Sequence, residues 1–249
     1  MISVLEEIKD LPAGGAAAVR IACLFDCYHG VLPSAMFWKQ TDADGKITAY
    51  ISKSENSVTL SAWKYADFEE LRAFLMSLGG KLFCSGDNHR ELKLNMNSRC
   101  GEELRLVNLP PKGNNNGEKT VNFTEQPDMK SLHAALRREF EMPDFETFYA
   151  DVFYRRRKGR IHFFTGQSDE ITVSSAMTTA ESGPSAAIGG VITDENFRGQ
   201  GLGSEAVTGL CRRLGKKEIF VCAKNSGVVD FYKKCGFEVS GLWTETEIY

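Results

Sequence analysis

The chain has 249 residues, of which 42% are hydrophobic and 25% are charged. These values are typical of a globular protein and exclude disordered, collagen-like and fibrous classes. At about 100 to 200 residues per domain, the length predicts two modest domains or one large one. The formal net charge of −3 argues against nucleic acid as a partner.

The seven cysteines are scattered and form no CxxC pair, so we expect reduced thiols in a cytoplasmic protein. Cys23, Cys27 and His29 lie close together, but no second ligand pair at zinc spacing accompanies them. We therefore expect buried helix cysteines and no metal. The acidic N-terminal segment does not resemble a signal peptide, and no apolar run reaches the ~20 residues of a membrane span.

A break in the pattern lies near the middle of the chain. Residues 109–120 read LPPKGNNNGEKT, and the Pro, Gly and Asn in this run disfavour both helix and strand. We therefore predict a linker here, with an N-terminal α/β domain over 1–115 and a second domain over 120–249.

The first half alternates between strand and helix patterns. Two segments with period-two alternation, KITAYIS and SVTLSAW, are separated by a turn at Glu55-Asn56. Behind Asp67, apolar residues at helical spacing, with Glu70 three residues later and Gly79-Gly80 at the end, predict a helix. The expected elements are a helix over 16–28, strands over 36–63, a helix over 68–78, a strand over 81–85 and a weaker mixed pattern over 87–108.

The second half opens with two helices and continues with strands and further helices. A hairpin is expected around Gly166 and Asp169, and Gly215 is expected to end the longest amphipathic helix. The expected elements are helices over 132–140 and 144–158, strands over 160–165, 170–180 and 186–193, a helix over 201–214, a strand over 218–222, a helix over 228–235, and strands over 237–243 and 246–249. This order predicts an α+β (mixed α/β) class, with helices on the faces of a mixed sheet.

The sharpest signal is the glycine-rich segment RGQGLGS at 198–204, between a predicted strand and a predicted amphipathic helix. Glycines let the backbone approach a ligand, and N–H groups at a helix start converge on negative charge, so the segment predicts an anion site. A turn that needs positive φ is the alternative interpretation. A Rossmann site would require GxGxxG after the first strand of a βαβ unit, and a P-loop would require GK[ST]; neither is present.

The order strand, R-x-x-G-x-G, helix, strand, Asn, helix ending in FYKKCGF resembles the GCN5-related N-acetyltransferase (GNAT) family over residues 120–249. The resemblance implies a GNAT-like twisted mixed sheet flanked by helices, and an acyltransferase with acetyl-CoA as acyl donor. In that family the loop amides bind the pyrophosphate of acetyl-CoA, and the end of the preceding strand holds the pantetheine arm. By position, cofactor-binding roles are implied for Val191, Ile192, Thr193, Arg198, Gly199, Gln200, Gly201, Leu202, Gly203, Ser204 and Asn225.

The resemblance also implies direct attack of a neutral amine on the acetyl thioester. Tyr232 matches the tyrosine near the thioester sulfur and is the expected catalytic residue, because its hydroxyl can protonate the departing thiolate. A backbone N–H near Ile192 would stabilise the oxyanion. Gly189-Gly190 fits the bulge that opens the pantetheine slot in this family.

Several of these positions have a structural interpretation of their own. Tyr232 lies on the apolar stripe of its helix, as a packed core residue would, and Asn225 fits an N-cap. Glu181, Asp194 and Glu195 are interpreted as solvated loop carboxylates, so we assign no general base.

Basic and aromatic residues outside these motifs have alternatives as well. The run RRRK at 155–158 closes a predicted helix, where cations are favourable in themselves. The functional alternative is attraction of an acidic acceptor or of the CoA phosphates. Trp63 and Trp243 are interpreted as packing residues.

The first half repeats the order of elements of the second half without its loop chemistry. The corresponding junction, SAWKYADFEEL, has no glycine, and its carboxylates Asp67, Glu69 and Glu70 would repel a pyrophosphate. One interpretation is a degenerate GNAT-like domain. The other is an unrelated α+β domain that covers the acceptor side or forms a dimer contact.

The leading hypothesis is an N-acetyltransferase that moves an acetyl group from acetyl-CoA to a primary amine of a small metabolite or amino-acid-like acceptor. The alternative is a non-catalytic acyl-CoA-binding regulatory module. An acyl group longer than acetyl and a homodimer are further hypotheses. Neither nucleic acid nor a membrane is an expected partner.

Overall fold

The computed structural model describes residues 1–8, 14–86, 88–94, 98–111 and 121–249, which form two compact units. The first unit comprises Met1–Arg105, Phe220–Val229 and Val239–Tyr249, and the second comprises Leu106–Ile219 and Asp230–Glu238. The units therefore differ from the sequential division into 1–115 and 120–249, because two C-terminal segments pack with the N-terminal residues. Residues 112–120 of the predicted linker lie outside the described residues.

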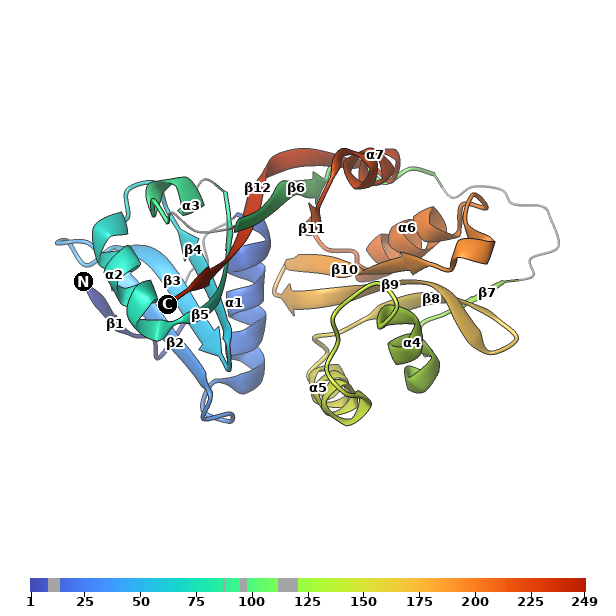
Figure 1. Cartoon of the computed structure of the whole chain (residues 1–249), viewed down its shortest axis with the longest axis horizontal. Coiled ribbons are helices and arrows are strands. Elements are labelled where there is room, and N and C mark those ends of the chain that lie inside the picture. Colours follow the sequence, from blue (N-terminus) through green and yellow to red (C-terminus); the bar gives the residue numbers. More distant parts are fainter. Residues whose placement is uncertain (9–13, 87, 95–97, 112–120) are drawn as a thin grey trace. The chain divides into compact units, whose positions relative to one another are not determined.

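The first unit is a mixed sheet with the strand order β1-β2-β3-β4-β5-β12-β6-β11 (Figure 1). Its elements are β1 (Ile2–Val4), α1 (Gly15–Tyr28), β2 (Ala35–Thr41), β3 (Ile47–Ser54), β4 (Ser57–Ala62), α2 (Phe68–Leu78), β5 (Gly80–Ser85), α3 (Asn88–Glu91) and β6 (Ser98–Leu106), with most of β11 (Glu218–Ala223) and β12 (Phe237–Ile248). β4 pairs in parallel with β5, and β5 pairs antiparallel with β12. Leu71 and Leu75 of α2 are fully buried against β3, β4 and β5.

The start of α2 is closed by carboxylates, as the sequence predicts. The Asp67 side chain accepts hydrogen bonds from the backbone N–H groups of Glu69 and Glu70, at 3.1 and 3.0 Å. The Glu70 carboxylate in turn accepts from Gln40 Nε2 at 2.8 Å and from the Ile2 N–H at 2.9 Å. Because Asp67 already accepts from the amides of Glu69 and Glu70, these two N–H groups are not available to an external anion.

The start of α1 is capped from a distant strand. Gly14 provides no side-chain cap, and Glu103 of β6 accepts the Ala16 N–H at 2.7 Å. The Ser85 hydroxyl accepts the Ala17 N–H at 3.3 Å. Burial raises the pKa of Glu103 above its ordinary value, although the hydrogen bonds from Ala16 and Ser85 and the charge of Arg20 act in the opposite direction.

Glu103→Gln is expected to change how stability depends on pH. A raised folded-state pKa means that folding favours the protonated carboxyl, so its contribution is complete below the ordinary value of 4.5 and is lost as pH rises through the folded-state value. The free energy of unfolding of the wild type should therefore fall relative to that of Glu103→Gln as pH rises from 4.5 through the folded-state value. Urea unfolding of both proteins across this range measures the difference, and a difference independent of pH would contradict the prediction.

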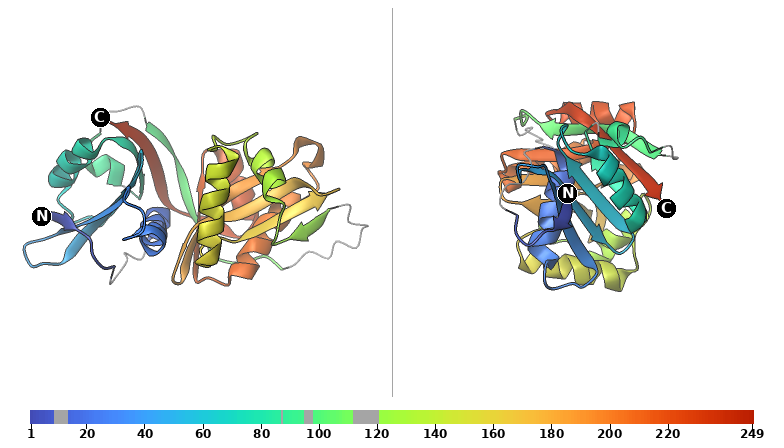
Figure 2. Two further views of the ribbon diagram at one scale, coloured as in Figure 1. Left: turned by 90° about the horizontal axis from the view of Figure 1, so that it is seen from below. Right: turned by 90° about the vertical axis from the view of Figure 1, so that its left-hand side faces the viewer.

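The second unit contains an antiparallel sheet in the order β7-β8-β9-β10, with α4 and α5 on one face and α6 on the other (Figures 1 and 2). Its elements are β7 (Asn122–Thr124), α4 (Met129–Leu136), α5 (Phe145–Arg157), β8 (Phe163–Ser168), β9 (Ile171–Ser182), β10 (Ser185–Thr193), a 3₁₀ turn (Glu195–Phe197) and α6 (Leu202–Leu214). Leu132, Phe148 and Val152 of α4 and α5 pack on Phe163 and Ile192 of the sheet. The helix α7 (Ser226–Lys234) contributes residues to both units.

The fold class is confirmed, and most predicted elements match within a few residues. Two details of the prediction are wrong. Gly166 lies inside β8, and the hairpin turn is formed by Asp169 and Glu170, both at positive φ. The two expected final strands are one strand, β12, because its residues 243–248 pair continuously with β5.

The helix cysteines are buried, as expected. Cys23 and Cys27 in α1 are 4% and 1% exposed, and His29 stacks on Phe25 with 4.2 Å between ring centroids. Among the residues that the structure describes, no group of three or more His, Cys, Asp or Glu side chains is arranged to hold a metal ion. Within the same residues, no helix combines the length and apolar character needed to cross a membrane.

Candidate functional site

The loop between β10 and α6 has the open backbone that its glycines predict. Gly199 and Gly201 adopt left-handed conformations, with φ of 79° and 78°. A Cβ atom built at either residue would meet no other atom within 4 Å, so the outer side of the loop is accessible to a ligand. The predicted turn with positive φ is therefore confirmed. Because these glycines have no side chain, a ligand can approach the backbone of the turn closely.

The start of α6 differs from that of α2 in having no side-chain cap. Gly201 is the N-cap residue and provides no acceptor, whereas Asp67 provides a carboxylate at α2. The first N–H groups of a helix have no acceptor within the helix, and the helix dipole favours an anion beside them. Gly203 in this turn is close to Thr193, because a Cβ there would lie 2.9 Å from Thr193 Oγ1.

β10 contains the predicted bulge. Its register against β9 shifts between the pairs Gly189–Met177 and Ile192–Ser175. Gly190 has φ of 56°, and its carbonyl accepts a hydrogen bond from Ser175 Oγ at 2.5 Å. A Cβ at Gly190 would lie 2.7 Å from Met177 Cγ, so the bulge requires glycine at this position.

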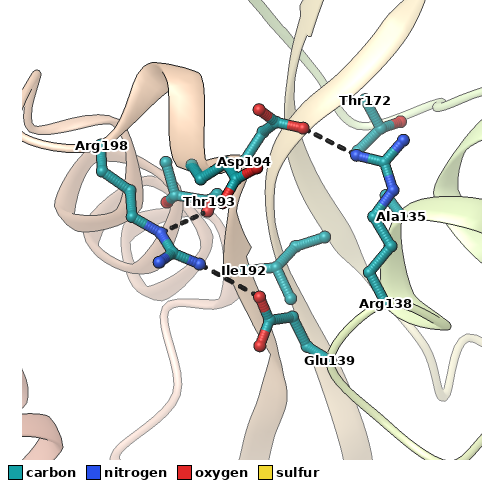
Figure 3. A pocket seen from close by; sticks show the side chains of 9 residues that line it. Ala135, Arg138, Glu139, Thr172, Ile192, Thr193, Asp194 and Arg198 are labelled. Atoms are coloured by element: carbon teal, nitrogen blue, oxygen red, sulfur yellow. Dashed lines mark hydrogen bonds and ion pairs between the residues drawn. The ribbon is translucent and has the colours of Figure 1, made fainter.

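A pocket of about 260 Å³ adjoins this loop (Figure 3). Arg138 Nη1 lies 2.7 Å from Asp194 Oδ2, and Arg198 Nη2 lies 3.1 Å from Glu139 Oε1. Arg198 Nε also donates to the Thr193 carbonyl at 3.2 Å. The two ion pairs join the segment after α4 to the segment after β10. The pocket is lined by Ala135, Arg138, Glu139, Thr172, Ile192, Thr193, Asp194, Glu195 and Arg198.

Three of the sequence-predicted residues, Ile192, Thr193 and Arg198, are thus brought together in one pocket. Sequence reasoning missed Arg138 and Glu139, which follow α4 in the chain. The only local signal for them is the charged run RREFE at 137–141, which does not indicate that it meets the end of β10.

The Asp194 carboxylate near the site has an environment that keeps it ionised. A hydrogen bond from the Asn196 N–H, together with the nearby Arg138, lowers the pKa of Asp194 despite some opposing desolvation. A carboxylate of low pKa accepts a proton poorly near neutral pH. Asp194 caps the 3₁₀ turn, so its position in a loop agrees with the sequence-based interpretation.

Glu181 is not a solvated loop carboxylate, and this expectation is wrong. It lies near the end of β9, is 3% exposed, and has Lys216 Nζ at 3.0 Å and His162 Nδ1 at 2.8 Å. Burial acts to raise its pKa, but the hydrogen bonds and charges of His162 and Lys216 outweigh burial and lower it. Glu181 therefore joins three segments of the second unit as an ion-pair centre and is a poor candidate for the general base.

Tyr232 and Asn225 have the structural roles that were considered for them. Tyr232 in α7 is 5% exposed, and its ring lies edge-on to Phe237 with 5.7 Å between centroids. Asn225 Oδ1 accepts the Val228 N–H at 3.0 Å, which confirms the N-cap. Tyr232 belongs to the second unit and Asn225 to the first. Their catalytic and cofactor-binding roles stay predictions.

Trp243 packs as expected. Its indole is 6% exposed, and Nε1 donates to the Ala223 carbonyl at 3.0 Å. Trp63 packs between Tyr50 and Tyr65, at centroid distances of 6.2 Å to each. Both indoles therefore contribute to packing within the first unit.

Comparison with known proteins identifies a family for part of the chain. Residues 129–237 match the sequence model of the Acetyltransferase (GNAT) family. No curated protein matches the chain significantly.

Solved structures resemble the chain over most of its length. A GCN5-related N-acetyltransferase from Sphaerobacter thermophilus has a TM-score of 0.61 and 14% identity, covering 85% of this chain and 80% of that one. A GNAT-family acetyltransferase from Colwellia psychrerythraea has a TM-score of 0.57 and 12% identity, with both chains covered completely. A tandem GNAT protein from the clavulanic acid biosynthesis pathway has a TM-score of 0.54 and 13% identity, covering 87% and 84%.

At these identities the structural likeness shows the fold alone. The first half of the chain repeats the order of elements of the second half. The relation of that half to a GNAT domain remains a hypothesis. The family match agrees with the glycine loop, the bulged strand and the helices of the second unit. Residues 129–237 are therefore a GNAT acetyltransferase domain, and the sequence-based interpretation as a GNAT-type acyltransferase is confirmed at the level of the family.

Proposed function

We propose that the chain is an N-acetyltransferase that moves an acetyl group from acetyl-CoA to a primary amine of a small metabolite or amino-acid-like acceptor. The observation that carries the proposal is the uncapped start of α6 behind two left-handed glycines with an open outer side. The pyrophosphate of acetyl-CoA would accept hydrogen bonds from the backbone N–H groups of residues 199–204. Arg198 would exchange the Glu139 carboxylate for a phosphate oxygen, since both are anionic acceptors for a guanidinium.

The strand end before this loop supports the proposal for the pantetheine arm. The amide groups of an extended arm would pair with the backbone of Val191, Ile192 and Thr193, beside the bulge at Gly190.

The proposed reaction needs an amine in its neutral form. Its nitrogen attacks the thioester carbon, the C–N bond forms, and the C–S bond breaks with its electron pair going to sulfur. The Tyr232 hydroxyl gives its proton to that sulfur, and the nitrogen loses a proton to water or a base. A backbone N–H near Ile192 would stabilise the negative charge on the carbonyl oxygen.

The experiment that tests the proposal measures free CoA. Acetyl-CoA is incubated with the protein and a panel of primary amines, including amino acids, and the released thiol is followed with a chromogenic disulfide. Release that depends on the amine is the expected result, and mass spectrometry should find the acetylated amine. Binding of acetyl-CoA without release across the panel would favour the alternative, a non-catalytic acyl-CoA-binding module. Repeating the assay with longer acyl-CoA thioesters tests the acyl chain length.

A further inference from the structure

The outer face of α5 carries a row of aromatic side chains that the proposed reaction does not use. Phe145, Tyr149 and Phe153 follow one another at i, i+4 spacing, with ring centroids 5.7 and 6.2 Å apart. We call these three residues the aromatic ladder. A cation lies at each end of it: Lys130 Nζ is 5.9 Å from the Phe145 ring, and Arg157 Cζ is 6.0 Å from the Phe153 ring.

The core of the second unit explains only the first residue of the aromatic ladder, because Phe145 is partly buried and packs against that core. Phe148 and Val152, on the other side of α5, are 5% and 2% exposed and pack against the sheet. Tyr149 and Phe153 are 45% and 51% exposed. Tyr149 and Phe153 thus form an exposed aromatic pair beside the packed face of α5, and adjacent exposed aromatic side chains are typical of an interaction surface.

The basic residues at 155–158 do not all have the same role. Arg155 is 12% exposed at its side chain, lies 3.4 Å from Asp151 Oδ2 and donates to the Thr179 carbonyl at 2.8 Å. Its role is therefore structural. Arg156, Arg157 and Lys158 are exposed. The favourable position of cations at a helix C-terminus explains why these residues are basic. It does not explain the exposed aromatic side chains that lie next to Arg157 on the same helix.

We propose that the aromatic ladder, with the exposed cations Lys130, Arg156, Arg157 and Lys158, is a docking surface for an acidic peptide segment of a protein partner. Aromatic rings and arginine are the side chains enriched at protein interfaces, where they supply most of the binding energy. Three adjacent exposed cations select acidic residues by charge complementarity. Apolar side chains of the same segment would pack on the exposed rings of Tyr149 and Phe153.

Fluorescence anisotropy with a defined probe tests this surface. The probe is a short fluorescein-labelled peptide of alternating glutamate and phenylalanine, and its counterpart has lysine in place of glutamate. The double variants Tyr149→Ser/Phe153→Ser and Arg156→Glu/Arg157→Glu are each expected to raise the Kd for the acidic peptide by about tenfold or more. Matched controls in the same unit are Ile171→Ser, at an apolar residue 58% exposed, and Lys217→Glu, at an exposed cation. Both controls should stay within about twofold of the wild type.

Several outcomes would overturn the proposal. These are no binding of the acidic peptide, equal binding of the lysine peptide, or Kd values that the two double variants leave unchanged. Sedimentation velocity tests for a dimer, and flotation with anionic phospholipid vesicles tests for a membrane surface. If the wild type does not bind the peptide but forms a dimer or binds vesicles, and the same double variants lose that interaction, the surface has that occupant and the peptide proposal is wrong. Circular dichroism and melting temperatures check that the variants fold. The assay uses no acetyl-CoA, so its result is independent of the proposed reaction.

Discussion

Acetyl-CoA is expected to raise the melting temperature of the wild-type chain, and Gly201→Glu is expected to abolish this increase. A ligand at about 100 times its Kd adds about 2.7 kcal/mol to the free energy of unfolding, a shift of several degrees for a domain of this size. Gly201 is the N-cap of α6, and nothing lies within 4 Å of a Cβ built there. A glutamate side chain at this position would put a carboxylate beside the amides that the pyrophosphate needs, and like charges repel.

The control for this variant is Gly215→Glu at the opposite end of the same helix. Gly215 is the C-cap residue, has φ of 57° and also has nothing within 4 Å of a built Cβ. Both substitutions place a side chain in the left-handed region, which costs about 1–2 kcal/mol, so both variants should melt below the wild type. Only Gly201→Glu should lose the response to acetyl-CoA. A full response in Gly201→Glu would mean that the loop is only a turn, and the acetyl-CoA proposal would lose its main support.

The parts of the site that could be predicted from the sequence are those that depend on neighbouring residues. The left-handed turn at Gly199 and Gly201 follows from the missing side chains, and the start of α6 follows from the apolar stripe behind it. The closed start of α2 is equally local, because Asp67 caps residues two and three positions later.

The parts that could not be predicted depend on contacts between distant segments. Arg198 meets Glu139 across 59 positions, and neither residue carries a signal for the other. Glu181 is the centre of an ion-pair cluster because the fold brings Lys216 and His162 to it. Its neighbours in the sequence carry no signal for these contacts, and they predict a loop instead. The pairing of β12 with β5 joins residues more than a hundred positions apart.

Short elements were missed for a different reason. β1 and β7 have three residues each, which is too short for an alternating pattern to stand out. They exist because β2 and β8 offer them backbone hydrogen-bonding partners at the edge of a sheet. Tertiary contacts also determine which unit a residue belongs to. Asn225 and Tyr232 are only seven positions apart in the sequence, yet they belong to different units.

Tyr232→Phe is expected to lower kcat for amine acetylation by about 100-fold or more, because it removes the proton donor proposed for the departing thiolate. The substitution keeps the ring that packs edge-on to Phe237, so the variant should fold and its melting temperature should still increase with acetyl-CoA. A merely structural tyrosine would leave kcat unchanged.

Steady-state kinetics with free-CoA detection measures this effect, with the KM for acetyl-CoA determined in the same series. Tyr50→Phe is the matched control, since Tyr50 is also buried, at 0% exposure, and lies on β3 of the first unit. The loss of a proton donor acts on the step in which the C–S bond breaks, so kcat should fall while the KM for acetyl-CoA stays near its wild-type value. An unchanged kcat in Tyr232→Phe would leave Tyr232 as a packing residue, and another group or water would then have to protonate the sulfur.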